Sequence, residues 1–355
     1  MDVALVAHRV DAADGTGGYA FEIVSRIARD HKVTVYAASV GPGLPPEVEV
    51  VRVPVPLRPA YATILSFPVA FAAVRRRHDL VHAQGWVTGS ADVVTAHIVL
   101  KAWREAARRA RVRTPWGERL FGPFVQQQEA RLLGSAASEV IAPSRRAADD
   151  LARCYGRTRG VTVIPHGFDR AVPAARRADV RRRLGLPSNV LVALYVGDPR
   201  KGLRVAVEAL DSAERVHLLV LSRSSPAVGP LSARVHWAPA GFTLAEAHAA
   251  SDVLLHPSIY DTFGLVVAEA MAHGLPVVVS REAGVSELIE HGKSGWLLER
   301  TDPQAAGAAL RLLAAEPVLR AQLAAGGRAV AARRRWDDAA RETLAVYRRA
   351  LDERR

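Results

Sequence analysis

Cysteine is nearly absent from this chain. Cys154 is the single cysteine among 355 residues, so no internal disulfide can form, which is typical of proteins in a reducing compartment. The sequence also contains no D-x-D segment and no Cys/His cluster at metal-ligand spacing. We therefore expect no bound metal and no cofactor, and expect protein groups to neutralise the charge of any anionic ligand.

Long apolar runs are missing as well. The longest candidate, residues 62–74, contains Pro68 and has about 13 residues, fewer than the roughly 20 that a membrane-spanning helix needs. Asp2 and His8 interrupt the apolar run at the N-terminus, so we expect no secretory signal. These features predict a cytoplasmic protein, and they leave open a peripheral attachment to the inner face of the membrane.

Length and charge limit the function classes further. With 355 residues, 49% of them apolar, the chain exceeds one typical core, and two domains of about 150–180 residues are expected. The net charge of +12 is mostly arginine. It is concentrated between Lys101 and Arg119, where seven basic side chains stand against two acidic ones.

Two interpretations of the basic segment 101–124 remain open. Arginines and aromatic rings together can lie on an anionic membrane surface, with the arginines at lipid phosphates. Alternatively, the segment is a solvated helix face, and Trp103, Trp116, Phe121 and Phe124 belong to the core. No helix-turn-helix, zinc finger or RNA-binding motif is present, so we expect no nucleic-acid partner.

The most informative segment is 252–280, where an apolar strand, a polar loop, a helix and a second apolar strand follow one another. Its apolar runs are typical of parallel strands buried on both faces. The helix is predicted from about Gly264 to His273. Ligands of such sheets lie beyond the carboxyl ends of the strands, so the amides of Phe263, Gly264 and Leu265 are expected to be unpaired and to attract a diphosphate.

This segment resembles the retaining glycosyltransferases of GT-B fold, and specifically glycosyltransferase family 4. That family has an acidic residue, an aromatic–Gly pair, a Glu eight positions after the acid, and then Ala-Met-Ala-x-Gly-x-Pro-Val-Val. The matching residues are Asp261, Phe263, Gly264, Glu269, Ala270, Met271, Ala272, Gly274, Pro276, Val277 and Val278. The first acid is usually Glu in the family, whereas this chain has the shorter Asp261.

The resemblance implies an α/β architecture of two Rossmann-like parallel-sheet domains facing a cleft. It implies an N-terminal acceptor-side domain over 1–165 and a nucleotide-sugar-binding domain over 166–335. A terminal helix within 336–355 would cross back to the first domain. Asp261 would then bind the transferred sugar, and Glu269 the ribose hydroxyls.

A second motif lies at the start of the C-terminal half. The loop GDPRKG, residues 197–202, resembles the family's V-G-R-x-x-x-K-G motif: Lys201 and Gly202 match, while Asp198 stands where arginine is usual. Gly197 is a further candidate for donor binding. A cation must offset the charge that accumulates on a departing nucleotide diphosphate. Lys201 is therefore the candidate cation and Arg200 a second one; an ordinary solvated turn is the alternative.

The N-terminal half begins with a predicted strand at 3–7, a glycine-rich turn at 14–18 and a helix at 19–29. This order can hold phosphate through backbone amides. A Rossmann dinucleotide site would need G-x-G-x-x-G spacing, which G-T-G-G lacks. The turn resembles the family's N-terminal Gly-Gly loop, so Gly17 and Gly18 are expected near the donor diphosphate, with a simple tight turn as the alternative.

A histidine is the candidate catalytic residue of this half. Residues 79–84 resemble the family's D-x-V-H-x-H pattern, with Gln84 at the second histidine, and residues 92–97 predict a strand that ends at His97. A histidine at the carboxyl end of a parallel strand can contact the donor sugar or assist the acceptor. The resemblance implies such a residue; a structural histidine is the alternative.

Together the motifs predict a glycosyltransferase that moves a hexose from a UDP- or GDP-linked sugar without a metal, with His97, Lys201 and Asp261 as catalytic residues. Retention of the anomeric configuration is implied by the resemblance alone. Three alternatives stay open: a nucleotide-sugar epimerase of the same architecture, a nicotinamide-dependent dehydrogenase, and a non-enzymatic basic protein of the membrane surface. The sequence does not specify whether the acceptor is a saccharide, a lipid-linked saccharide or a small molecule.

Overall fold

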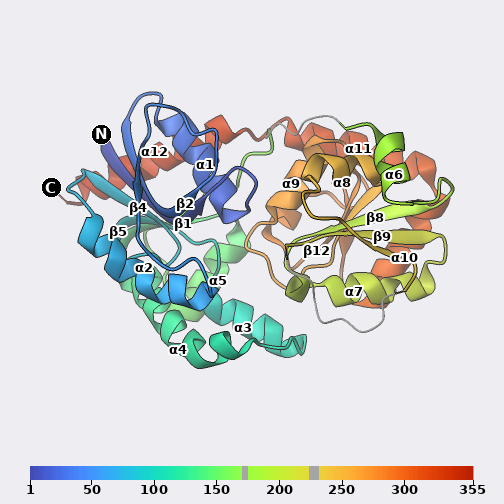
Figure 1. Ribbon diagram of the computed structural model, residues 1–355, viewed down its shortest axis with the longest axis horizontal. Helices are drawn as coiled ribbons and strands as arrows, with labels where there is room; N and C mark the ends of the chain where they lie inside the picture. The colour runs from blue at the N-terminus through green and yellow to red at the C-terminus, as the bar shows by residue number, and fades with distance from the viewer. Residues whose placement is uncertain (170–174, 224–231, 355) are drawn as a thin grey trace. The chain divides into compact units, whose positions relative to one another are not determined.

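The computed structural model describes residues 1–169, 175–223 and 232–354, which form two compact units (Figure 1). The N-terminal unit consists of Met1–His166 together with Trp336–Arg355, and the C-terminal unit of Gly167–Arg335. Each unit is built on its own parallel sheet, as the alternation of apolar runs and amphipathic segments predicts.

The N-terminal unit contains a seven-stranded sheet among the described residues, in the order β3-β2-β1-β4-β5-β6-β7. All its strand pairs are parallel. The strands are β1 (Asp2–Val10), β2 (Lys32–Val40), β3 (Glu49–Arg52), β4 (Leu80–Gln84), β5 (Ala91–Thr95), β6 (Ala137–Ala142) and β7 (Val161–Val163).

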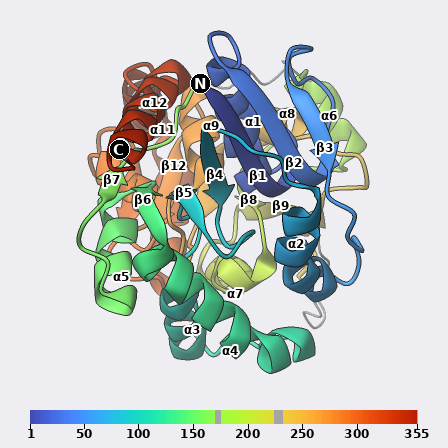
Figure 2. The same cartoon turned by 90° about the vertical axis from the view of Figure 1, so that its left-hand side faces the viewer.

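Helices of this unit come from both ends of the chain. They are α1 (Thr16–Ile27), α2 (Ala60–Val74), α3 (Leu100–Arg109), α4 (Trp116–Arg131), α5 (Arg145–Tyr155) and α12 (Trp336–Asp352). The terminal helix α12 packs beside α1 and against β5 and β6 (Figure 2), where it buries Trp336 and Tyr347 completely. The predicted return of the C-terminal helix to the first domain is confirmed.

The described part of the C-terminal unit contains a six-stranded parallel sheet in the order β10-β9-β8-β11-β12-β13. The strands are β8 (Leu191–Val196), β9 (Val216–Leu221), β10 (Val235–Trp237), β11 (Val253–His256), β12 (Val277–Ser280) and β13 (Trp296–Leu298). The helices are α6 (Arg177–Arg183), α7 (Leu203–Glu208), α8 (Leu244–Ala250), α9 (Leu265–Ala272), α10 (Pro303–Ala315) and α11 (Pro317–Ala331).

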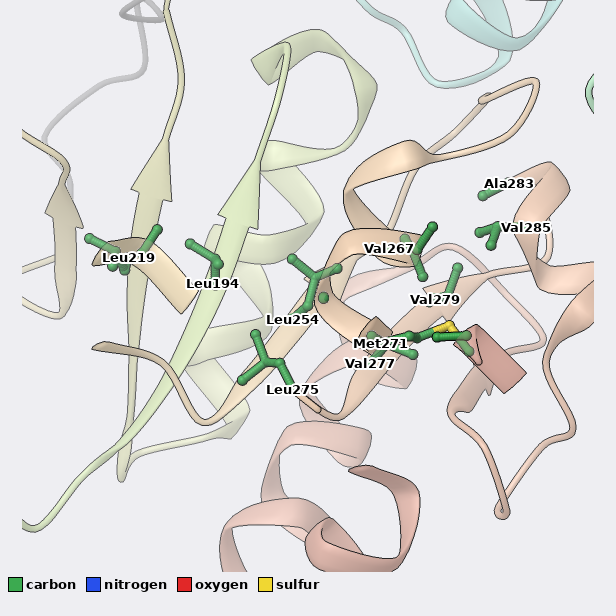
Figure 3. Packing of buried hydrophobic residues seen from close by; sticks show 14 of the residues in the cluster. Leu194, Leu219, Leu254, Val267, Met271, Leu275, Val277, Val279, Ala283 and Val285 are labelled. Carbon is green, nitrogen blue, oxygen red and sulfur yellow. The ribbon is translucent and has the colours of Figure 1, made fainter. Parts of the chain in front are cut away.

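Apolar packing fixes helix α9 on this sheet. Val267 and Met271 of α9 are fully buried and belong to the same cluster as Leu254 of β11 and Val277 of β12 (Figure 3). These strands are apolar on both faces because helices cover both sides of a doubly wound sheet. The start of α9 is thereby held at the edge of the sheet where the strands end.

Candidate functional site

The candidate site lies where the strand order of the C-terminal sheet reverses. From β8 the chain passes to β9 on one side, whereas β11 pairs with β8 on the other side. The loops that follow β8 and β11 therefore diverge from neighbouring carboxyl ends, and such a point is where open parallel sheets bind ligands.

Two contacts tie these loops together. The amide of Ile259 donates to the carbonyl oxygen of Lys201 at 2.7 Å. A Cβ atom at Gly202 would lie 2.2 Å from the carbonyl oxygen of Pro257, and the φ of Gly202 is +154°. Only glycine permits so close an approach, so the Lys-Gly pair places the lysine directly against the neighbouring loop.

Lys201 and Asp261 form an ion pair although 60 residues separate them in the sequence. Their Nζ and Oδ2 atoms are 3.0 Å apart, and the side chains are 36% and 16% exposed. Burial by itself would raise the pKa of Asp261, but the charge of Lys201 and the contact with His256 outweigh burial and hold that pKa well below its usual range. Asp261 is therefore a carboxylate at neutral pH.

The loop after Asp261 turns into helix α9 through a glycine. Gly264 has φ +99° and ψ 61°, a conformation that favours glycine, and α9 begins at Leu265. Among the described residues, the amides of Gly264, Leu265 and Val266 donate to no acceptor, as is usual for the first turn of a helix. Such amides favour an anion.

The prediction of an unpaired amide is wrong for Phe263. Its N–H donates to Oδ1 of Asp261 at 3.3 Å, because an Asp side chain can turn back onto the backbone two residues later. The unpaired amides therefore begin one residue later than expected, and one oxygen of the carboxylate has a partner within its own loop.

Glu269 lies in the second turn of α9 and is buried. Its carbonyl oxygen accepts hydrogen bonds from the amide of His273 at 3.1 Å and from the His273 ring at 2.7 Å, which closes the end of the helix. The structure thus brings Lys201 and Asp261 into contact and places Glu269 on the helix that follows the Asp261 loop.

Arg200 is paired with Asp198 in the other loop. Its Nη2 lies 2.8 Å and its Nε 3.1 Å from Oδ2 of Asp198, whose Oδ1 also accepts from the Arg200 amide at 2.9 Å. Burial would raise the pKa of Asp198, but the hydrogen bonds from Arg200 lower it on balance. Gly197 supplies the turn out of β8 with φ +125°. Asp198 thus offsets the charge of Arg200 locally.

The sequence interpretation overlooked His256. This buried histidine ends β11, and its Nε2 lies 3.6 Å from Oδ2 of Asp261, within ion-pair distance but longer than a hydrogen bond. The signal was present, since a polar residue that closes an apolar strand of a parallel sheet faces the ligand-binding edge.

In the N-terminal unit the glycine pair lies within a helix rather than in a loop. Helix α1 begins at Thr16, so the prediction of a turn through Gly18 is wrong, and both Gly17 and Gly18 are buried in the first turn. A Cβ at Gly17 would lie 3.1 Å from the carbonyl oxygen of Arg9, which explains why a poor helix former stands there. The amides of Thr16, Gly17 and Gly18 have no acceptor among the described residues.

His97 lies two residues beyond the end of β5, not in the strand as predicted. Its Nε2 is 2.7 Å from Oε1 of Gln84, whose Nε2 is 3.2 Å from the buried His82 ring. His82 contacts the Tyr347 hydroxyl at 2.7 Å. Burial lowers the pKa of His97 to about 3, so this ring is neutral at physiological pH and is held by a chain of buried polar groups.

The basic segment 101–124 forms parts of α3 and α4, and its aromatic residues divide between the two interpretations. Trp103 is buried, so for this ring the core interpretation holds. Trp116, Leu120 and Phe124 are 68%, 57% and 50% exposed, and their spacing of four residues places them on one face of α4. Over the described residues, no helix has the length and apolar character needed to cross a membrane.

Two family models match the chain. "Glycosyltransferase Family 4" matches residues 13–172, and "Glycosyl transferases group 1" matches residues 190–316. The first match covers most of the N-terminal unit and the start of the C-terminal one, and the second lies within the C-terminal unit and includes Lys201, Asp261 and Glu269.

Curated relatives extend the match. A D-inositol 3-phosphate glycosyltransferase of Xylanimonas cellulosilytica is 33% identical over 313 residues, covering 78% of this chain and 73% of the relative. The enzyme of the same name from Acidothermus cellulolyticus is 32% identical, covering 78% of this chain and 68% of the relative.

Solved structures share the fold. Sucrose-phosphate synthase from Thermosynechococcus elongatus has a TM-score of 0.78 at 23% identity and covers 99% of both chains. Anabaena Alr3699/HepE in complex with UDP and glucose has a TM-score of 0.73 at 20% identity, covering 98% of this chain and 99% of its own. The chain is therefore a glycosyltransferase of GT-B fold that belongs to glycosyltransferase family 4.

Proposed function

We propose that this glycosyltransferase moves a hexose from a UDP- or GDP-linked sugar to an acceptor, and that the C-terminal unit binds the donor. The observation that carries this proposal is the Lys201–Asp261 ion pair at the switch point, beside the unpaired amides of Gly264 and Leu265. A flexible ammonium group and a helix N-terminus together suit a diphosphate.

In this mechanism the bond between the anomeric carbon and the diphosphate oxygen breaks while the acceptor hydroxyl oxygen bonds to the same carbon. The hydroxyl proton passes to the departing diphosphate, on which the remaining negative charge accumulates. Lys201 and the α9 amides stabilise that charge, and Arg200 supplies a second cation when it leaves Asp198. Asp261 orients the sugar and Glu269 binds the ribose hydroxyls.

The N-terminal unit contributes the remaining proposed groups. The first-turn amides of Gly17 and Gly18 lie near the donor diphosphate, and neutral His97 contacts the sugar or the acceptor hydroxyl. Metal independence and retention of the anomeric configuration are part of the proposal. Activity that survives a chelator, and an α-linked product from an α-linked donor, would support them.

The comparisons suggest which substrates to test first. Two relatives are named D-inositol 3-phosphate glycosyltransferases, and one structural neighbour holds UDP and glucose. UDP-glucose with D-inositol 3-phosphate is thus the first donor and acceptor pair, followed by GDP sugars and lipid-linked saccharides.

A thermal-shift screen tests donor binding. A ligand at about 100 times its dissociation constant should stabilise the protein by about 2.7 kcal/mol. Lys201→Met should abolish the shift, whereas Lys293→Met, which removes a 73% exposed lysine from another turn, should preserve it. If UDP, GDP and their sugars all give no shift with the unsubstituted protein, the proposed donor class is wrong.

We also propose that the enzyme is cytoplasmic and that the exposed face of α4 contacts the anionic inner face of the membrane, which would place the enzyme at a lipid-linked acceptor. Trp116 and Phe124 provide apolar area, and the exposed Arg111 and Arg119 complement lipid phosphates.

The double substitution Trp116→Ser/Phe124→Ser should abolish sedimentation of the protein with phosphatidylglycerol vesicles. Val318→Ser, at a 66% exposed position of the C-terminal unit, is the matched control. Equal binding to phosphatidylcholine vesicles would contradict an anionic partner.

A further inference from the structure

His256 has a ring nitrogen without a hydrogen bond in the structure. Its Nε2 atom is buried and has no partner at hydrogen-bond distance among the described residues, and the nearest acidic oxygen is Oδ2 of Asp261 at 3.6 Å. Buried polar atoms are normally paired, so an unpaired one beside a candidate catalytic carboxylate needs an explanation.

The surroundings place this ring nitrogen beside the start of α9. His256 pairs with Val279 in the sheet, and a Cβ at Gly264 would lie 3.5 Å from its Nε2 atom. The ring nitrogen therefore lies between the start of α9 and the carboxylate. A small movement of the Asp261 side chain would bring it into hydrogen-bond range.

The carboxylate already has partners when no ligand is bound. Lys201 holds Oδ2 at 3.0 Å, and the Phe263 amide donates to Oδ1 at 3.3 Å. If Lys201 turns to a donor diphosphate, Asp261 loses its nearest cation while only 16% of its side chain is exposed. Removing one partner of a partly buried ion pair is unfavourable, and the carboxylate would otherwise follow the lysine.

We propose that His256 is a positioning residue that forms a hydrogen bond with Asp261, in place of the ion pair with Lys201, when Lys201 binds the donor. The ring donates its Nε2–H to Oδ2, no proton is transferred, and the carboxylate keeps its orientation toward the sugar. This inference rests on the proposed function, because that function supplies the anion that draws Lys201 away.

Three substitutions separate this role from packing. His256→Gln keeps an N–H donor close to the Nε2 position, His256→Asn sets the donor back toward the backbone, and His256→Leu keeps the bulk but removes the donor. We expect at least tenfold weaker binding of UDP or GDP by calorimetry, and at least a tenfold lower kcat/KM, for Asn and Leu. Gln should remain within threefold of the unsubstituted protein. Equal effects of Gln and Leu would show a packing role and overturn the proposal.

A second experiment needs no donor. In a Lys201→Met background the cation is already gone, so His256→Leu should reduce the equilibrium constant for folding of the C-terminal unit at least tenfold more than it does in the unsubstituted protein. Additive effects would overturn the proposal. If the two substitutions are strongly coupled but the unsubstituted protein binds neither UDP nor GDP, the interaction of His256 with Asp261 is supported and the proposed donor class is refuted.

Discussion

Substitution of Gly202 tests whether its close approach to Pro257 holds Lys201 in position. In Gly202→Ala the new Cβ would lie 2.2 Å from the Pro257 carbonyl oxygen, about 0.8 Å inside the closest separation that such atoms adopt. The loop that carries Gly202 must therefore move away from the loop that follows β11. That movement breaks the hydrogen bond from the Ile259 amide to the Lys201 carbonyl.

The expected cost follows from these two losses. An alanine at φ +154° is strained by about 1–3 kcal/mol, and a lost buried hydrogen bond costs about 1 kcal/mol. We therefore expect Gly202→Ala to lower the free energy of unfolding by about 3 kcal/mol. It should also weaken nucleotide binding, because Lys201 moves with the loop.

Gly185→Ala is the matched control for backbone strain alone. Gly185 has φ +63° and a Cβ there would meet no atom within 4 Å, so only about 1 kcal/mol is expected. Calorimetric unfolding with and without UDP measures both variants. A chain with two units can unfold in two steps. The step that the core substitution Leu254→Ala shifts to lower temperature is assigned to the C-terminal unit. Equal destabilisation by both glycine substitutions, with unchanged UDP affinity, would refute the reasoning.

Two further outcomes are expected. In a double-mutant cycle of Lys201→Met and Asp261→Asn, the coupling free energy at pH 7 should be about 2 kcal/mol, because this pair is less solvated than exposed ion pairs. Exposed pairs give about 0.2–1 kcal/mol. Calorimetric unfolding measures the coupling free energy, and a value below about 0.2 kcal/mol would contradict the inferred pairing. Burial raises the pKa of Glu129 to about 7, against an ordinary value of 4.5. Its contribution to stability is therefore present below pH 4.5 and lost as the pH rises through 7. Relative to Glu129→Gln, urea unfolding should show a loss of about 3 kcal/mol across that window, and identical pH profiles would exclude it.

Much of the C-terminal site could be predicted because the strands there are clear apolar runs. The two apolar strands predicted within 252–280 are observed as Val253–His256 and Val277–Ser280, and the helix predicted from about Gly264 to His273 is observed as Leu265–Ala272. Once β8 and β11 are neighbours, the loops that carry Lys201 and Asp261 must start from the same edge. The contact between Lys201 and Asp261 is thus a consequence of the strand order. It could be predicted from two motifs that are distant in the sequence.

Other features depended on tertiary packing or on local turns. Gly17 and Gly18 suggested a loop because glycine is a poor helix former, but the close approach of the Arg9 carbonyl at Gly17 favours a residue without a side chain inside the helix. The pairing of the Phe263 amide follows a known preference of Asp side chains, which the prediction of an anion site ignored. The place of His256 at the end of an apolar strand was visible in the sequence and was overlooked, whereas the lack of a hydrogen bond at its Nε2 atom depends on packing that a single sequence does not show.

The terminal helix has a consequence for synthesis of the chain. The C-terminal unit is one continuous stretch, whereas the N-terminal unit is interrupted and requires α12 to supply Trp336 and Tyr347. During synthesis on a ribosome, the C-terminal unit can therefore finish folding before the N-terminal unit. In the N-terminal unit, His82 can contact the Tyr347 hydroxyl only after α12 has been synthesised. A chain that stops at Arg335 should keep a protease-resistant C-terminal unit and lose protection of the N-terminal unit; equal protection of both would show that the first unit matures without its last helix.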